Sequence, residues 1–242
     1  MAAPDLTAHY ASYYGSADLA AWRELGARDK AEMILALTEG LFSQPPRVAD
    51  IGCGDGSVMA TLDQHHFAAE LVGFEVSASG AEAARRRDFG VPCRVELYDG
   101  YHIPADTGEF DLVVVSHVLE HVENPRGFLS EAARIGRYVL VEVPLELHAR
   151  TPHDFQWTEV GHINLFNSRL LRHLVQSLGL RIERELIATS GREVQQYLRP
   201  GVRGDLRWLV KRGLLGISPR LATKLLTYNG ALVASHDEPR QR

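Results

Sequence analysis

The chain has 242 residues, of which 45% are hydrophobic and 24% charged, so it can bury one sizeable core and is short for two. We therefore expect residues 1–242 to form a single domain. The net charge of -5 and a pI near 6.1 argue against wholesale binding to nucleic acid or anionic membranes. Two cysteines, Cys53 and Cys93, exclude a zinc knuckle and a disulfide framework. With no leader-like N-terminus and no long apolar run, we expect a cytoplasmic protein.

Hydrophobic periodicity predicts helices and strands that alternate along most of the chain. A first helix is predicted over 19–42, where Pro45 and Pro46 stop it. Further helices are predicted at 57–65, 79–89 and 168–178, with another that begins at 117–122. Strands are predicted at 47–51, 71–76, 93–98, 111–115, 138–143, 181–188 and 225–234.

This alternation predicts an α/β fold, a doubly wound sheet with helices on both faces. Residues 1–44 are expected to form a helical cap, and 192–226 a less regular insertion between the last two strands. The insertion carries eight Lys and Arg residues against Glu193 and Asp205. Contact with an anionic acceptor, a membrane surface or a partner is one interpretation, and a pair of helices with a solvated basic face is the other.

A glycine-rich turn follows the first strand, the usual ligand position in such sheets. Gly52, Gly54 and Gly56 allow a sharp bend and a close approach of a ligand to the backbone. The dinucleotide fingerprint requires a third glycine at position 57, which is Ser57, so a dehydrogenase is disfavoured. Glu75 ends the second strand at the spacing where a carboxylate binds ribose hydroxyls.

Five segments together resemble the motifs of class I S-adenosylmethionine-dependent methyltransferases. They are VADIGCGDG at 48–56, GFEVS at 73–77, YDG at 98–100, EFDLVVV at 109–115 and SHVLEHV at 116–122. The resemblance covers roughly residues 45–190. It implies a Rossmann-like, seven-stranded sheet in the order 3-2-1-4-5-7-6 with an antiparallel last strand, and S-adenosyl-L-methionine as cofactor.

The resemblance also implies which residues surround the cofactor. Glu75 would bind the ribose hydroxyls, Val76 would pack on the adenine, and the methionine part would lie in the glycine turn. The full set of implied cofactor-binding residues is Asp50, Gly52, Cys53, Gly54, Gly56, Glu75, Val76, Asp99, Gly100, Ser116 and His117. Tyr13 or Tyr14 of the N-terminal segment is a candidate to close over the cofactor.

Histidines between positions 102 and 162 supply candidate general bases. On the helix predicted from 117, residues 117, 120 and 121 would share one face. The catalytic candidates are His117, His121 and His153.

A weaker resemblance, to metal-assisted O-methyltransferases with an E-x-x-E-H segment and a later histidine, suggests a divalent metal at Glu120, His121 and His162. His117 replaces the first glutamate of that segment. The alternative is that these side chains only form hydrogen bonds within the fold.

The first functional hypothesis is methyl transfer to a small-molecule acceptor, with oxygen as the methylated atom. The second is a metal-assisted 2′-O-methyltransferase that acts on an RNA end or another anionic acceptor, although the net charge disfavours nucleic acid. The third is a cofactor-binding regulatory subunit without catalysis, because the motifs indicate binding more directly than turnover. The sequence does not define the oligomeric state.

Overall fold

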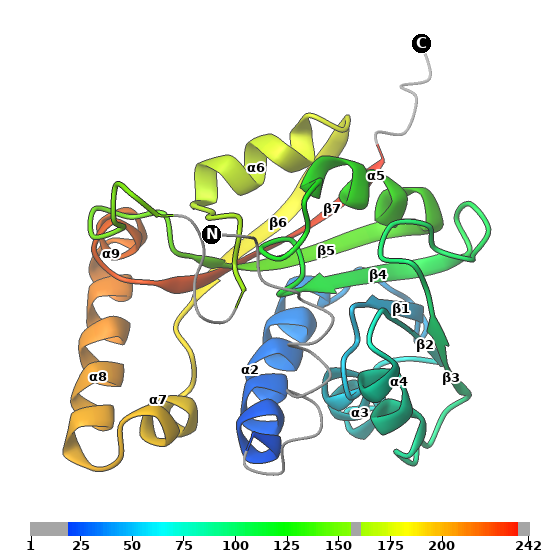
Figure 1. Ribbon diagram of the computed structural model, residues 1–242, viewed down its shortest axis with the longest axis horizontal. Helices are drawn as coiled ribbons and strands as arrows, with labels where there is room; N and C mark the ends of the chain where they lie inside the picture. The colour runs from blue at the N-terminus through cyan, green and yellow to red at the C-terminus, as the bar shows by residue number, and fades with distance from the viewer. Residues whose placement is uncertain (1–18, 156–160, 237–242) are drawn as a thin grey trace.

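The computed structural model describes residues 19–155 and 161–236 (Figure 1). Its strands are β1 (Arg47–Ile51), β2 (Glu70–Glu75), β3 (Cys93–Leu97), β4 (Phe110–Ser116), β5 (Gly136–Leu145), β6 (Leu180–Ala188) and β7 (Tyr228–His236). Its helices are α2 (Ala20–Thr38), α3 (Ser57–Gln64), α4 (Ala78–Arg85), α5 (Pro125–Ile135), α6 (Ser168–Gln176), α7 (Arg192–Leu198), α8 (Val202–Ile217) and α9 (Pro219–Leu225). None of these helices is long and apolar enough to cross a bilayer.

In the described chain the strands form one seven-stranded sheet in the order β3-β2-β1-β4-β5-β7-β6. Neighbouring strands from β3 to β5 are parallel, and β7 runs antiparallel to both β5 and β6. This arrangement confirms the predicted fold class and strand order. Asp50 of β1 lies opposite Gly73 of β2 and Val114 of β4, so the carboxyl ends of these strands meet at one edge.

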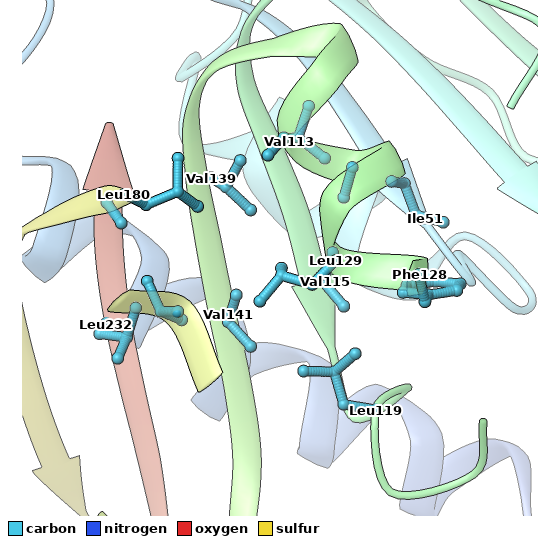
Figure 2. Packing of buried hydrophobic residues seen from close by; sticks show 14 of the residues in the cluster. Ile51, Val113, Val115, Leu119, Phe128, Leu129, Val139, Val141, Leu180 and Leu232 are labelled. Carbon is cyan, nitrogen blue, oxygen red and sulfur yellow. The ribbon is translucent and has the colours of Figure 1, made fainter. Parts of the chain in front are cut away.

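Alternating residues of each strand face two apolar layers, as expected for strands buried on both sides. Val113 and Val115 pack with α5 and α6 on one face, and Figure 2 shows this cluster. Leu112 and Val114 pack with α2, α3 and α4 on the other face. The two layers fix the sheet between the helices, so side chains at the strand ends are held rigidly.

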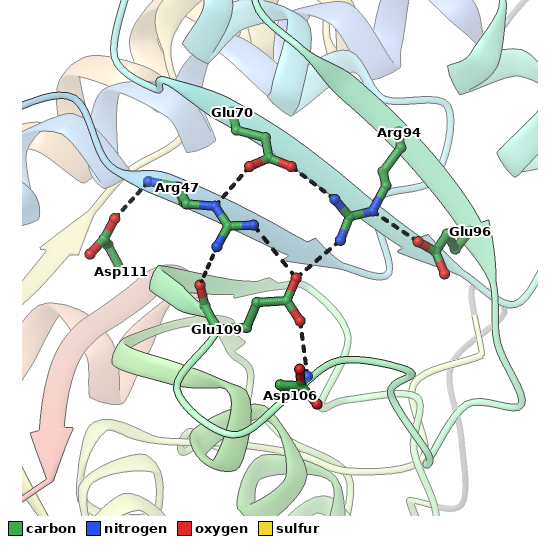
Figure 3. Close-up of polar contacts among 7 residues, drawn as sticks. All are labelled: Arg47, Glu70, Arg94, Glu96, Asp106, Glu109 and Asp111. Atoms are coloured by element: carbon green, nitrogen blue, oxygen red, sulfur yellow. Dashed lines mark hydrogen bonds and ion pairs between the residues drawn. The ribbon is translucent and has the colours of Figure 1, made fainter.

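The amino edge of the sheet carries a network of ion pairs rather than a ligand site. Arg47 donates from Nε to Glu70 Oε2 at 2.7 Å, and Arg94 donates from Nη1 to Glu70 Oε1 at 2.8 Å. Asp111 accepts from the Arg47 backbone amide at 2.8 Å (Figure 3). Exposed pairs of this kind contribute little individually. The opposite, carboxyl edge is where ligands bind in this class of sheet.

Three sequence predictions about local structure differ from the structure. Residues 117–122 form a turn, because His117 takes a φ of +56° that no helix tolerates, and the helix α5 begins only at Pro125. Asn124 caps α5 by accepting from the amide of Gly127 at 3.0 Å. Residues 192–226, expected to be less regular, form α7, α8 and α9. The helix α9 continues to Leu225, so β7 begins at Tyr228, three residues later than predicted.

We predict that Leu112→Ala lowers the free energy of unfolding by about 2–5 kcal/mol, because the removed atoms leave a cavity in a closed layer. Leu112 of β4 is fully buried. Leu97→Ala is the matched control, since Leu97 of β3 is 48% exposed and its loss is expected to change stability by about 0.5 kcal/mol or less. Urea denaturation followed by far-UV circular dichroism measures both. Equal losses in the two variants would contradict the assignment of the core.

Candidate functional site

The turn between β1 and α3 is built from glycines because its backbone requires them. Gly52, Gly54 and Gly56 have φ values of +77°, +58° and +74°, which side chains disfavour. A Cβ on Gly52 would also lie 2.6 Å from Cγ2 of Val118. The Gly52 amide donates to the Phe74 carbonyl at 2.7 Å, which fastens the turn to β2. The turn therefore presents bare backbone at the carboxyl edge of the sheet.

Glu75, at the end of β2, holds this turn in place. Its Oε2 accepts from the Gly54 amide and its Oε1 from the Ser77 amide, both at 2.8 Å. The side chain is buried, which raises the pKa of the carboxyl, while these backbone bonds oppose the rise. A carboxylate accepts about four hydrogen bonds, so both oxygens retain capacity for a ligand.

Asp50 is a buried carboxyl beside the same turn. Its Oδ2 has no hydrogen-bond partner among the described residues. Burial raises the pKa of Asp50 to about 7, and the positive charge of Lys30 on α2 opposes this rise. An unpaired buried acceptor is costly, which favours a hydrogen-bond donor or a cation at this position when a ligand is bound.

Three further residues of the implied cofactor site lie on the rim beyond β2 and β3. Asp99 Oδ1 accepts from the amides of Tyr101 and His102 at 2.8 and 2.6 Å, and these bonds lower the pKa of the exposed carboxyl. A Cβ on Gly100 would lie 3.5 Å from Val76, whose side chain is 44% exposed. The rim thus combines an accessible apolar side chain with an ordered carboxylate.

Cys53 points away from this surface. A Cβ on Gly73 would lie 2.6 Å from the Cys53 sulfur, so the thiol packs against β2 in the core. Burial raises the pKa of the thiol well above its ordinary value. Only the backbone of Cys53 can face a ligand in the turn.

The ends of β4 and β5 bring together a cluster of buried charges. Ser116 donates to Glu142 Oε2 at 2.7 Å. The His117 Nδ1 lies 3.2 Å from Glu120 Oε1, and its Nε2 lies 3.5 Å from Glu142 Oε1. Both glutamates are fully buried, and apart from the His117 contact at Oε1 the Glu120 carboxylate has no partner among the described residues, so its Oε2 is unpaired.

The protonation states in this cluster follow from these contacts. Burial and the charge of Lys30 lower the pKa of His117. The carboxylates of Glu120 and Glu142 raise it by more than this, so the pKa lies above its ordinary value, at about 9. Burial raises the pKa of Glu120 and Glu142, and the nearby histidines reverse this, so both stay below their usual value. The raised pKa favours the protonated form of His117 at neutral pH, as a cation between two carboxylates, and a protonated imidazole is not a general base.

Glu120, His121 and His162 converge although no helix connects them. Each offers one ligand atom, and these atoms lie within 4.8 Å of one another. The two imidazole rings meet edge to face, with centroids 4.9 Å apart. His121 Nδ1 contacts the Gly161 carbonyl at 3.1 Å, and His162 Nδ1 contacts Glu146 Oε2 at 2.7 Å. An oxygen and two imidazoles with oriented rings fit a divalent cation.

His121 differs from His117 in charge. Burial lowers the pKa of His121, although the Glu120 carboxylate opposes this shift. A carbonyl can only accept, so the contact with Gly161 requires a proton on Nδ1 of His121. Nε2 is then the nitrogen that can accept a proton or bind a metal.

Glu142 and Lys30 belong to this cluster although no sequence motif indicated them. Glu142 interrupts the otherwise apolar run of β5, and a carboxylate inside a buried strand was the available signal. Lys30 lies on α2, and nothing in the helical pattern marks its position beside Asp50, His117 and Glu142, whose pKa values its charge influences.

The structure does not bring the remaining sequence candidates into this cluster. His153 is an exposed loop residue. Tyr13 and Tyr14 lie outside the described residues, so their proposed closure over the cofactor stays a prediction.

Residues 20–185 match a family model described as a methyltransferase domain. The chain is 34% identical over 113 residues to an uncharacterized 37.1 kDa protein of a Streptomyces fradiae transposon, which covers 44% of this chain and 33% of that protein. It is 27% identical over 100 residues to a ubiquinone biosynthesis O-methyltransferase of Pectobacterium atrosepticum, with 40% of each chain covered. The chain thus spans two fifths or less of the length of these curated relatives.

Among solved structures, the magnesium protoporphyrin IX methyltransferase of Synechocystis PCC 6803 with bound SAH superposes with a TM-score of 0.61. The alignment covers 94% of this chain and 98% of that one, at 16% sequence identity. At this identity the likeness shows a shared fold.

We predict that Asp50→Asn gains stability relative to the parent as pH rises from about 5 to about 8. The folded pKa of about 7 lies above the ordinary aspartate value, so the parent loses stability as Asp50 ionises, and asparagine cannot ionise. Asp88→Asn is the matched control, because Asp88 is exposed. Urea unfolding at both pH values measures the difference. An unchanged pH dependence in Asp50→Asn would overturn the prediction.

Proposed function

Because the chain belongs to the methyltransferase domain family, we propose that it transfers the methyl group of S-adenosylmethionine to a hydroxyl of a small-molecule acceptor. Family membership confirms the resemblance drawn from the motifs and, with it, S-adenosylmethionine as the cofactor. The acceptor, the methylated atom and the role of each residue belong to the proposal.

The observation that carries the proposal is the Glu75 carboxylate bound to the glycine turn at the carboxyl edge of β1. The bare backbone at Gly52 and Gly54 leaves room for the methionine part of the cofactor, and Glu75 has acceptor capacity for two ribose hydroxyls. Val76 offers an exposed apolar surface for the adenine. The unpaired Asp50 Oδ2 suits the positively charged ligand.

S-adenosylmethionine supplies an activated methyl carbon, so that an oxygen–carbon bond forms as the carbon–sulfur bond breaks. The chain must hold the acceptor oxygen in line with the carbon–sulfur bond and accept the proton of the acceptor hydroxyl. We assign the proton to Nε2 of His121, which is neutral and oriented by Gly161. His117, as a cation, instead holds Glu120 and Glu142 in place. His153 remains a second candidate base from the adjoining loop.

Glu120, His121 and His162 would hold a divalent metal if one is used, and the metal would lower the pKa of a bound acceptor hydroxyl. The buried Glu120 carboxylate supports this assignment, because its Oε2 has no hydrogen-bond partner among the described residues. The Glu146 contact to Nδ1 of His162 would orient that ring. With a metal bound, His121 would be a ligand, and another group would receive the proton.

An oxygen acceptor is supported by the name of one relative, a ubiquinone biosynthesis O-methyltransferase, which resembles part of the chain. A small molecule is supported by the net charge of -5, which disfavours a long polyanion.

We predict that Glu75→Gln weakens binding of S-adenosylhomocysteine by about tenfold or more, because the charged acceptor for the ribose hydroxyls is lost. Glu70→Gln is a matched control at the other end of the same strand, where Glu70 pairs with Arg47 and Arg94. Titration calorimetry measures both affinities, and thermal melting establishes that the variants are folded. If Glu75→Gln and the parent bind S-adenosylhomocysteine with equal affinity, Glu75 does not contact the cofactor.

Incubation with methyl-labelled S-adenosylmethionine and pools of small hydroxy compounds tests the function itself. We expect transfer, and a loss of about a hundredfold or more in His121→Gln, since a general base contributes about 10²–10⁴-fold. His173→Gln, on the exposed side of α6, is the matched control. Cofactor binding without transfer to any acceptor, or transfer only to RNA, would contradict the proposal. If His153→Gln abolishes transfer and His121→Gln does not, the base is His153.

Metal analysis separates the two forms of the mechanism. Retained divalent ion, loss of activity in chelator and loss of the ion in Glu120→Gln would support the metal form, with Glu123→Gln as a control on the exposed side of the turn. Full activity in chelator, with no ion in the purified protein, would favour direct proton transfer.

A further inference from the structure

A pocket lies in the helical segment between β6 and β7, and none of its lining residues belongs to the glycine turn. In Figure 1 this segment, α7 to α9, lies at one end of the molecule, with α7 and α9 in contact with α8 near its opposite ends. The pocket has a volume of about 600 Å³. Its lining combines four cationic with four apolar residues, namely Arg199, Arg203, Arg207, Lys211, Pro200, Leu206, Val210 and Leu226.

The cations share one wall of the pocket because of their spacing. Arg203, Arg207 and Lys211 follow one another at four-residue intervals on α8, so they lie on one face of that helix. Arg199 approaches from the end of α7. Leu206 and Val210 lie beside them on the neighbouring ridge. Cationic and apolar surfaces therefore meet within one cavity.

No carboxylate among the described residues pairs with these four cations. The nearest acidic residue on α8, Asp205, is bound by Arg192 at 2.6 and 2.9 Å and by Gln196 at 2.6 Å. The charges instead repel one another. Burial lowers the pKa of Arg207, and so do the charges of Arg199 and Arg150. The folded chain thus concentrates positive charge without a counter-ion of its own.

Lys211 shows that this charge is built into the fold. Its side chain is only 4% exposed, and lysine is almost never so buried unless it is paired. Its Nζ lies 4.9 Å from the centre of the Tyr228 ring, and Tyr228 donates from its hydroxyl to the Lys211 carbonyl at 2.9 Å. Burial, and then the charge of Arg207, lower the pKa of Lys211 to about 8. A bound anion would offset both costs.

We propose that this pocket binds the phosphoryl group of an amphiphilic ligand. Three guanidinium groups and one ammonium match the multiple charges of a phosphate ester or diphosphate better than the single charge of a carboxylate. The planar arginine forks suit phosphate oxygens, and Leu206, Val210 and Leu226 accept the apolar part of the ligand. The pocket shares no lining residue with the glycine turn. The proposal therefore does not require the ligand of this pocket to be the methyl acceptor.

Calorimetry on the full chain tests the proposal with four probes: pyrophosphate, dodecyl phosphate, phosphatidylcholine vesicles and the same vesicles with phosphatidic acid. We expect binding of a phosphoryl probe that weakens as salt is added. Lys211→Met and Arg203→Gln should each weaken it by about tenfold or more. Lys211→Met keeps the volume of a buried side chain, and Arg203 is exposed, so at least one variant is expected to fold.

Arg212→Gln is the matched control, because Arg212 lies next to Lys211 on α8 but stacks on Trp208 and does not line the pocket. Binding of a soluble probe would identify a free phosphorylated ligand, and binding only of the acidic vesicles would identify a lipid headgroup; either supports the site. The proposal is overturned if no phosphoryl probe binds, or if Arg212→Gln weakens binding as much as Arg203→Gln.

Discussion

The two hydrogen bonds of the Glu75 carboxylate are the interaction on which the cofactor site depends. They join the Gly54 amide, in the turn after β1, to the Ser77 amide at the start of α4. One buried side chain thereby fixes the distance between the ends of two parallel strands. A carboxylate is tolerated in an apolar core only when it is bonded in this way. The parallel register of β4 and β5 then brings Ser116 and Glu142 to the same edge.

Two regions of opposite charge follow from this arrangement. Around the glycine turn and the end of β4, the buried carboxylates of Asp50, Glu120 and Glu142 outnumber the cations that face them, Lys30 and His117. Along α8 the balance is reversed. Low dielectric strengthens both fields, so each region selects a ligand by the sign of its charge. An overall charge of -5 conceals this division; the sequence showed its basic part in residues 192–226, and the fold gathers the buried carboxylates of its acidic part.

The strands were predicted well because they are apolar runs between glycine and proline signals, and the resemblance to a known family implied their order, which the structure confirms. It failed at His117, where helical spacing suggested a shared face, because a positive φ depends on the tertiary position of the strand end. The approach of His162 to Glu120 and His121 was expected from resemblance, but it is produced by a turn instead of a helix. The roles of Glu142, Lys30 and Lys211 depend on contacts between distant elements, so local sequence patterns could not reveal them.

The position of β7 has a consequence for how the protein is made. β7 lies between β5 and β6, although it follows both along the chain, and β6 has no other strand neighbour in the described sheet. During synthesis β6 therefore emerges before its partner strand. Its backbone groups cannot form their interstrand hydrogen bonds until residues 228–236 have been synthesised. Non-local pairing of this kind is slow and exposes strand edges meanwhile. The half of the sheet that carries the glycine turn can assemble first, and insertion of the last strand completes the fold.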